Sequence, residues 1–248
     1  MRWSHELLLV ALFCLIYVSL RAVMVQSGAK ATEHALTIVH METVLGIFHE
    51  HAVQTLFLRW PDVVRVFNLY YGGTHFVVPA VALVWLALRH PIRYRQARNV
   101  LAVATAVAFV CFWLFPVAPP RLLPAHFGIL DTLKTMGGSA HVESSLISSA
   151  GDVYAAMPSL HVGWAVWCTV ALFPVVRRRL VRAILVLYPV VTTVVVVATG
   201  NHFFSDAATG AALVVLVWLI VAPLTTSRKQ PSPVDREPSL DVAHQPMA

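Results

Sequence analysis

Charged residues are scarce in this chain. They make up 12% of its 248 residues, whereas soluble domains carry about 25%. Hydrophobic residues make up 58%, and the mean hydropathy is +0.72. This excludes a soluble domain and indicates an integral membrane protein. The net charge of +6 does not indicate nucleic acid as a partner, because the basic residues cluster at the ends of apolar segments, where membrane topology explains them.

Cysteine is scarce as well. The three cysteines, Cys14, Cys111 and Cys168, all lie inside apolar segments. Their spacing fits neither a disulfide framework nor a metal site, so they are better explained as small buried hydrophobic residues. The sequence gives no reason to expect a bound metal or a cofactor.

Long apolar segments, by contrast, are abundant, and a membrane span needs about 20 such residues. We expect spans at 6–25, 66–88, 99–117, 157–176, 183–199 and 203–224. The predicted fold class is all-α, a polytopic membrane bundle of about six transmembrane helices. The first segment also has features of a signal peptide, because Arg2 precedes it and small residues at 27–29 follow it, so its cleavage stays open.

The segment between the first two spans is more polar. Residues 31–58 interleave apolar positions with seven histidines and glutamates, namely Glu33, His34, His40, Glu42, His49, Glu50 and His51. This pattern predicts one or two amphipathic helices at the membrane interface or packed against the bundle. The histidines could bind a metal, but they show no repeated ligand spacing, which favours a solvated polar face.

Three parts of the chain are expected. Residues 1–30 hold the N-terminal transmembrane helix, and 31–224 form the membrane domain. The tail, 225–248, has four prolines and mixed charge, which predict disorder. Within the membrane domain, a loop of about forty residues, 118–156, joins the third and fourth spans, and loops of this length are uncommon and often functional.

Basic residues orient the predicted bundle. They crowd two connections and the tail, at Arg89, Arg93, Arg95, Arg98, Arg177, Arg178, Arg179, Arg182, Arg228, Lys229 and Arg236. The positive-inside rule places these segments and both termini in the cytoplasm. The loop 118–156 and the turn at Gly200 and Asn201 are then extracytoplasmic. We expect a multi-pass protein of a bacterial cell membrane, with its active site on the extracytoplasmic face.

Candidate catalytic residues fall on that same side. His202 and Asp206 are four residues apart, so they share one face of a helix. A carboxylate that holds one ring nitrogen of a histidine leaves the other nitrogen nucleophilic. His161, at the start of another apolar run, is placed to act as general acid and base. Together these residues indicate phosphoryl transfer, the alternative being that they only cap and pack helices.

Two further residues could bind phosphate oxygens. Arg121 offers a fork of donors, and Ser159 stands at a helix start whose free N–H groups could meet an anion. His75 lies inside the second span, where a histidine is either functional or hydrogen-bonded for structural reasons.

The motifs around these residues resemble the type 2 phosphatidic acid phosphatase superfamily. Met157-Pro158-Ser159-Leu160-His161 is similar to its second signature, and His202-x-x-x-Asp206 to the end of its third. The stretches 115–122 (FPVAPPRL) and 199–202 (TGNH) are similar to its inositolphosphotransferase branch, which includes the fungal inositol phosphorylceramide synthases. The resemblance extends from about Glu42 to Leu224.

This resemblance implies a role for each motif residue. His202 would be the nucleophile that forms a phosphohistidine, Asp206 its partner and His161 the acid and base, with no metal required. Phosphatases of the superfamily usually carry two more phosphate-binding cations, where this chain has Leu114 and Val196. Either other cations, such as Arg98 or Lys134, replace them, or the substrate is a less charged phosphodiester.

We therefore expect a lipid phosphotransferase that moves a phosphoryl-containing headgroup, such as phosphoinositol, with membrane lipids as substrates and no protein partner. The enzymatic alternative is a phosphatase acting on phosphatidate or a polyprenyl (di)phosphate. The non-enzymatic alternative is a proton-coupled transporter or a lipid-binding protein. A transporter would be expected to carry ionisable residues at mid-span and an internal repeat, whereas here the polar residues lie at helix ends and no repeat is evident.

Overall fold

The computed structural model describes residues 11–12, 15–16, 19, 27–137 and 154–227. In these ranges the chain is helical, with no strand beyond an isolated bridge between Val117 and Ala155. The predicted all-α fold is confirmed. Most of the first predicted span lies outside the described residues, as do 138–153 of the long loop and the tail from 228 onward.

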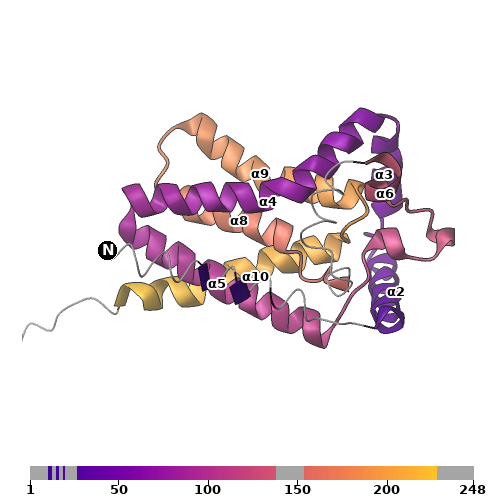
Figure 1. The fold of residues 1–248 in the computed structure, drawn as a ribbon, viewed down its shortest axis with the longest axis horizontal. Coiled ribbons are helices and arrows are strands. Elements are labelled where there is room, and N and C mark those ends of the chain that lie inside the picture. Colours follow the sequence, from indigo (N-terminus) through magenta and orange to yellow (C-terminus); the bar gives the residue numbers. More distant parts are fainter. Residues whose placement is uncertain (1–10, 13–14, 17–18, 20–26, 138–153, 228–248) are drawn as a thin grey trace, which may run out of the picture.

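The N-terminal half of the described chain contains two short helices followed by two long ones. They are α2 (Gly28–Val44), α3 (Glu50–Leu58), α4 (Pro61–Arg89) and α5 (Pro91–Leu114). The pair α2 and α3 occupies the polar segment where one or two helices were expected. In Figure 1, α2 runs across one end of the bundle instead of along it.

The arginine-rich connection predicted over residues 89–98 is wrong. Only His90 separates α4 from α5, and Arg93, Arg95 and Arg98 lie on the first turns of α5. Pro91 explains the difference, because proline is well suited to the first position of a helix, where its missing N–H is not needed.

The C-terminal half is built around a short central helix. Its helices are α8 (Leu160–Leu172), α9 (Arg179–Ala198) and α10 (Phe204–Ser227). Helix α8 packs against α4, α5, α9 and α10, and it buries residues on all of its sides, including Trp164, Trp167 and Cys168. A helix that is apolar all round belongs in the core of a bundle.

Four helices in the described part of the chain are long and apolar enough to cross a membrane: Pro61–Arg89, Pro91–Leu114, Arg179–Ala198 and Phe204–Thr225. Helix α8 has 13 residues and is about 20 Å long, which is shorter than the hydrocarbon core of about 30 Å. The predicted fourth span therefore corresponds to a short buried helix that the four longer helices surround.

The two ends of the bundle differ in character. At one end, Arg93 donates to the carbonyl oxygens of Val170 and Ala171, at the C-terminus of α8. At the same end, Asn99 donates to Thr225 at the C-terminal end of α10. The N-termini of α8 and α10 lie at the opposite end, where α2, α3 and α6 (Thr132–Met136) gather (Figure 1).

The described part of the long loop is ordered. It contains two 3-10 turns, η1 (Pro120–Leu122) and η2 (Ala125–Phe127), followed by α6. Its first residues are tied to α2, because the Ala118 N–H donates to the Ala31 carbonyl. This brings Arg121 to the end of the bundle where α8 and α10 begin.

Candidate active site

The turn between α9 and α10 sets the position of His202. Gly200 adopts a left-handed conformation (φ 72°) just after the last residues of α9, and its N–H donates to the Val197 carbonyl. The Asn201 N–H donates to the Val196 carbonyl, which completes the two hydrogen bonds of a Schellman ending. Only glycine adopts this conformation without steric cost, so the turn depends on Gly200.

The imidazole of His202 is buried and held at one nitrogen. Its Nδ1 lies 2.9 Å from the Ala156 carbonyl oxygen and 3.4 Å from Oδ2 of Asp206. Both neighbours are acceptors, so Nδ1 carries the hydrogen, and Nε2 is then the basic nitrogen of the neutral ring. Nε2 has no hydrogen-bond partner among the described residues. The sequence predicted Asp206 as the partner, and the structure adds the nearer carbonyl of Ala156.

His161 lies beside His202 in a cluster of rings. The centroids of the two imidazoles are 5.5 Å apart. On its other sides His161 stacks on Tyr71 at 4.1 Å and lies 4.0 Å from the ring of His75, both from α4. His75 itself is held through Nδ1 at the Tyr71 carbonyl. The sequence left open whether His75 has a functional or a structural role. The structure places it in the same site as the two predicted histidines, His161 and His202.

Helices α8 and α10 approach each other very closely at this site. A Cβ atom on Gly210 would overlap the carbonyl oxygen of Ser159, and one on Gly163 would lie 3.1 Å from the carbonyl oxygen of Gly210. The Ser159 N–H donates to the Asp206 carbonyl at 2.9 Å. Glycines at these two positions therefore allow His161 and His202 to share one site.

Ser159 is fully buried and serves as the N-cap of α8. Its hydroxyl accepts a hydrogen bond from the Val162 N–H at 3.4 Å. This explains why serine suits the position, since the first N–H groups of a helix need acceptors. The predicted contact of Ser159 with phosphate stays a prediction.

Carboxylates surround the first turn of α10. Oδ2 of Asp206 accepts from the Phe203 N–H at 2.9 Å, Oε1 of Glu50 from the Phe204 N–H at 3.0 Å, and Oε1 of Glu42 from the Ser205 N–H at 2.7 Å. All three carboxyl groups are fully buried. The prediction of a solvated polar face is therefore wrong for Glu42 and Glu50. Their side chains extend from α2 and α3 and accept hydrogen bonds from backbone N–H groups at the start of α10.

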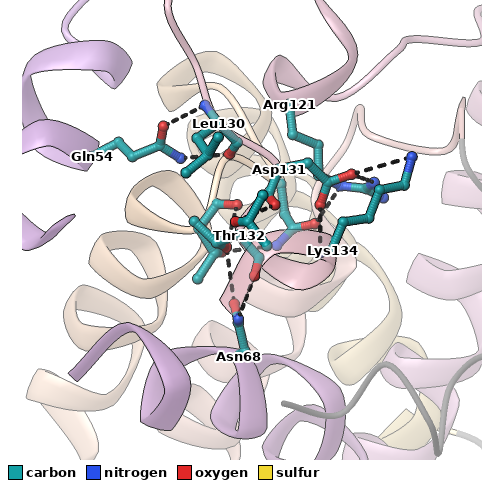
Figure 2. A network of polar contacts seen from close by, with 10 residues as sticks. Gln54, Asn68, Arg121, Leu130, Asp131, Thr132 and Lys134 are labelled. Atoms are coloured by element: carbon teal, nitrogen blue, oxygen red, sulfur yellow. Dashed lines mark hydrogen bonds and ion pairs between the residues drawn. The ribbon is translucent and has the colours of Figure 1, made fainter. Parts of the chain in front are cut away.

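Arg121 is anchored to the turn that precedes His202. Its backbone N–H donates to the Gly200 carbonyl, and its Nε donates to Oδ1 of Asn201 at 2.9 Å. One terminal nitrogen donates to Oδ2 of Asp131 at 3.2 Å, and Lys134 lies 3.8 Å from the same oxygen (Figure 2). The sequence predicted Arg121 at the site, but nothing in its pattern indicated Asp131.

Two buried amides hold this loop against the bundle. Gln54 both donates to and accepts from the backbone of Leu130, and it also donates to the Ala198 carbonyl (Figure 2). Asn68 exchanges hydrogen bonds with Thr132, whose hydroxyl also reaches the Thr199 carbonyl. Side chains from α3 and α4 thus fix the loop that carries Arg121.

The structure distinguishes Arg98 from Lys134, the two cations proposed to replace the phosphate-binding cations that are absent at positions 114 and 196. Lys134 shares Asp131 with Arg121, whereas Arg98 lies near the C-terminal end of α10, where its neighbour Asn99 bonds Thr225. The 24 residues of α10 separate its C-terminal end from its N-terminal end, beside His202, by more than about 30 Å. Arg98 therefore cannot reach a phosphate at His202. Leu114 is exposed on α5 and Val196 is buried in α9.

The histidines of the segment 31–58 do not form a common site. Nδ1 of His34 lies 2.7 Å from the Pro116 carbonyl oxygen, and its ring stacks on Phe115. The His51 ring instead lies 3.4 Å from the Thr55 hydroxyl and packs against Gly128. Among the described residues, no group of three or more histidine, cysteine, aspartate or glutamate side chains is arranged to hold a metal ion.

Comparison with known proteins gives one match. A family model described as the PAP2 superfamily matches residues 36–220, about three quarters of the chain. The matched region includes His161, His202, Asp206 and Arg121. No curated protein and no solved structure matches the chain.

Proposed function

The chain belongs to the PAP2 superfamily and is therefore a membrane enzyme of the phosphatase or phosphotransferase type, and we propose that it transfers a phosphoryl-containing headgroup between membrane lipids. In this proposal the headgroup passes through a phosphohistidine on His202. Phosphoinositol is the headgroup favoured by the likeness of residues 115–122 and 199–202 to the inositolphosphotransferase branch.

The state of the His202 ring carries the proposal. Because Nδ1 faces the Ala156 carbonyl and Asp206, the ring keeps its hydrogen there and leaves a basic nitrogen at Nε2. A positioned imidazole nitrogen of this kind can attack phosphorus. When the Nε2–P bond forms, the ring gains positive charge, which the Asp206 carboxylate stabilises through Nδ1–H.

The first half-reaction forms the intermediate. Nε2 of His202 attacks the phosphorus of the donor lipid, and the bond from phosphorus to the departing oxygen breaks. His161, in its protonated form, gives a proton to that oxygen, so the first product leaves as an alcohol. The phosphoryl group and its headgroup remain on His202.

The second half-reaction reverses these roles. The neutral His161 takes the proton of an acceptor hydroxyl, whose oxygen attacks phosphorus as the Nε2–P bond breaks. His202 returns to its starting state and His161 to its protonated form, so protons balance over the cycle. Water in place of the acceptor would make the same residues a phosphatase.

The charge near Arg121 favours a diester donor. Arg121 and Lys134 are positive, but both lie against the Asp131 carboxylate, so this group of three carries a formal net charge of +1. A phosphodiester carries one negative charge, whereas a phosphate monoester carries nearly two near neutral pH. The charge of this group of three therefore matches a diester better than a monoester.

The proposed transfer is tested in one assay that measures both transfer of the headgroup and release of free phosphate. Purified protein in vesicles is given phosphatidylinositol with a labelled headgroup, together with ceramide, diacylglycerol or a polyprenol as acceptor. We expect a labelled acceptor adduct and release of the lipid alcohol, with neither formed by His202→Ala. Rapid phosphate release from phosphatidate or polyprenyl diphosphate, with no adduct from any diester, would identify a phosphatase instead.

A further inference from the structure

Helix α10 has no N-cap side chain that could accept a hydrogen bond. The residue that precedes it is Phe203, whose side chain has no hydrogen-bonding group. The first N–H groups of a helix have no partner within the helix, and buried donors without acceptors are costly. Acceptors other than the N-cap side chain are therefore needed, next to the residue proposed as the nucleophile.

Three carboxyl groups from three helices fill this need. Asp206 reaches back to the Phe203 N–H, as in a capping box, while Glu50 from α3 and Glu42 from α2 accept from the next two N–H groups. Negative charge at a helix N-terminus is also favoured by the helix dipole. Both glutamates are distant in sequence, so they tie two separate helices to the first turn of α10.

The two glutamates are also neighbours at the start of α10. Each uses Oε1 for α10, and neither Oε2 receives a hydrogen bond from an N–H or hydroxyl donor of the described residues. Burial and the neighbouring Glu42 carboxyl both raise the pKa of Glu50. A raised pKa favours the protonated form of a buried carboxyl group.

We propose that Glu42 and Glu50 are positioning residues that hold the first turn of α10 so that Asp206 and His202 keep their geometry. This inference rests on the proposed function of His202. The pair does not touch the reacting atoms. It acts through the backbone of residues 203–205, which lie between the nucleophile and its carboxylate partner.

Loss of the proton on Glu50 would disturb this arrangement. Burial, together with the neighbouring Glu42, raises the pKa of Glu50 to about 8. The titratable group that acts on the pair from the start of α10 is Asp206, which itself contacts His202, and Glu42 and Glu50 are neighbours from α2 and α3. Above that pH two buried carboxylates would repel each other at the start of α10.

The kinetic test compares two substitutions at one position. Glu50→Ala removes the acceptor for the Phe204 N–H, and we expect kcat to fall by about 10- to 100-fold with a smaller change in KM, because a displaced catalytic group loses rate. Glu50→Gln keeps an acceptor and an N–H that can bond Glu42, so it should recover most of the lost kcat. Glu33→Gln, on the exposed side of α2, is the matched control.

The proton on Glu50 is tested without any assay of turnover. Because the pKa of Glu50 is raised from its ordinary value of 4.5 to about 8, the contribution of Glu50 to the free energy of unfolding is most favourable below about pH 4.5 and becomes less favourable as pH rises to about 8. The melting temperature of the detergent-solubilised protein should therefore fall between about pH 5 and about pH 8. In Glu50→Gln this fall should be much smaller, and in Glu33→Gln it should match wild type.

Several results would overturn the inference. An unchanged kcat in Glu50→Ala would show that the glutamate does not position the site, and an equal loss in Glu50→Ala and Glu50→Gln would exclude the hydrogen-bonding role. A melting temperature with the same pH dependence in wild type and Glu50→Gln would exclude a proton on Glu50. Undiminished turnover in His202→Ala would instead refute the proposed function, while the melting data would still report on the pair.

Discussion

At the scale of single residues, the environment of Nδ1 decides what His202 can do. With the Ala156 carbonyl at 2.9 Å and Asp206 at 3.4 Å, one ring nitrogen is occupied and the other is left for chemistry. Asp206 has a second task, since the same Oδ2 accepts the Phe203 N–H. One carboxylate thus links the start of α10 to the orientation of the imidazole.

We predict that His202→Ala abolishes turnover while the protein stays folded, because it removes the imidazole nitrogen that the Ala156 carbonyl and Asp206 position for attack. Asp206→Asn should lower kcat by about 10²- to 10⁴-fold, as for other carboxylates that orient a histidine. His161→Ala should be comparably damaging through loss of proton transfer. Steady-state kinetics checks all three, with melting curves to confirm folding.

His40→Ala serves as control, because His40 lies on the exposed side of α2. Near-normal turnover in the His202 variant would contradict the phosphohistidine mechanism. A labelled donor offers a second check, since a phosphohistidine is labile in acid and stable in base. Label retained in acid would point to a different nucleophile.

The residues most easily predicted from sequence were those inside a motif. His161, His202 and Asp206 lie at the starts of apolar helices, where an ionisable residue is costly to bury and is therefore a candidate for function. Glu42 and Glu50 could not be predicted in the same way. They occur among other charged and histidine residues, and that pattern is typical of a solvated helix face, whereas their acceptor role depends on α10, about 160 residues further along.

At the scale of elements, the contact between α8 and α10 is the tightest in the site. Ser159 begins one helix, Asp206 lies in the first turn of the other, and Gly210 one turn later leaves room for the Ser159 carbonyl. The contact is backbone against backbone, so a side-chain rotation cannot relieve a clash there. The distance between His161 and His202 follows from it.

Gly210→Ala tests this contact. The added methyl would overlap the Ser159 carbonyl and push α8 from α10, so we expect loss of most activity and a lower melting temperature. Gly73→Ala is the matched control, because no atom lies within 4 Å of its Cβ position and alanine favours a helix. Wild-type activity in Gly210→Ala would mean that the two helices are not held at this distance.

The ends of the helices were harder to predict than their existence. The apolar segments at 66–88, 183–199 and 203–224 correspond to α4, α9 and α10. The start of α5 was missed by eight residues, because the arginines of 93–98 suggested a connection, although they lie on helix turns and bond carbonyls of α8 and residues of α5. Local charge marks the end of a span but does not by itself end a helix.

At the scale of the whole molecule, charge is divided between the ends of the bundle. Arg93, Arg98 and Arg182 lie at the end where α8 terminates, and two of them bond the carbonyls of residues 170, 171 and 176. His161, His202 and Arg121 lie at the other end. The sequence allowed this separation to be predicted, because loop charges and apolar lengths fix which helix ends face the same way.

This separation leads to a prediction about orientation. If the arginine end faces the cytoplasm, as the positive-inside rule requires, the site faces the opposite compartment. In a background with Cys14, Cys111 and Cys168 replaced by alanine, single cysteines can be placed as Ala125→Cys, in η2 beside Arg121, and as Arg178→Cys, just before α9. Both positions are exposed, so accessibility to an impermeant maleimide depends on the compartment alone.

On intact cells the Ala125→Cys variant should be labelled and the Arg178→Cys variant should not, whereas permeabilised cells should label both. The reverse pattern would place the site in the cytoplasm, and it would then have to receive its lipid substrates from the inner leaflet.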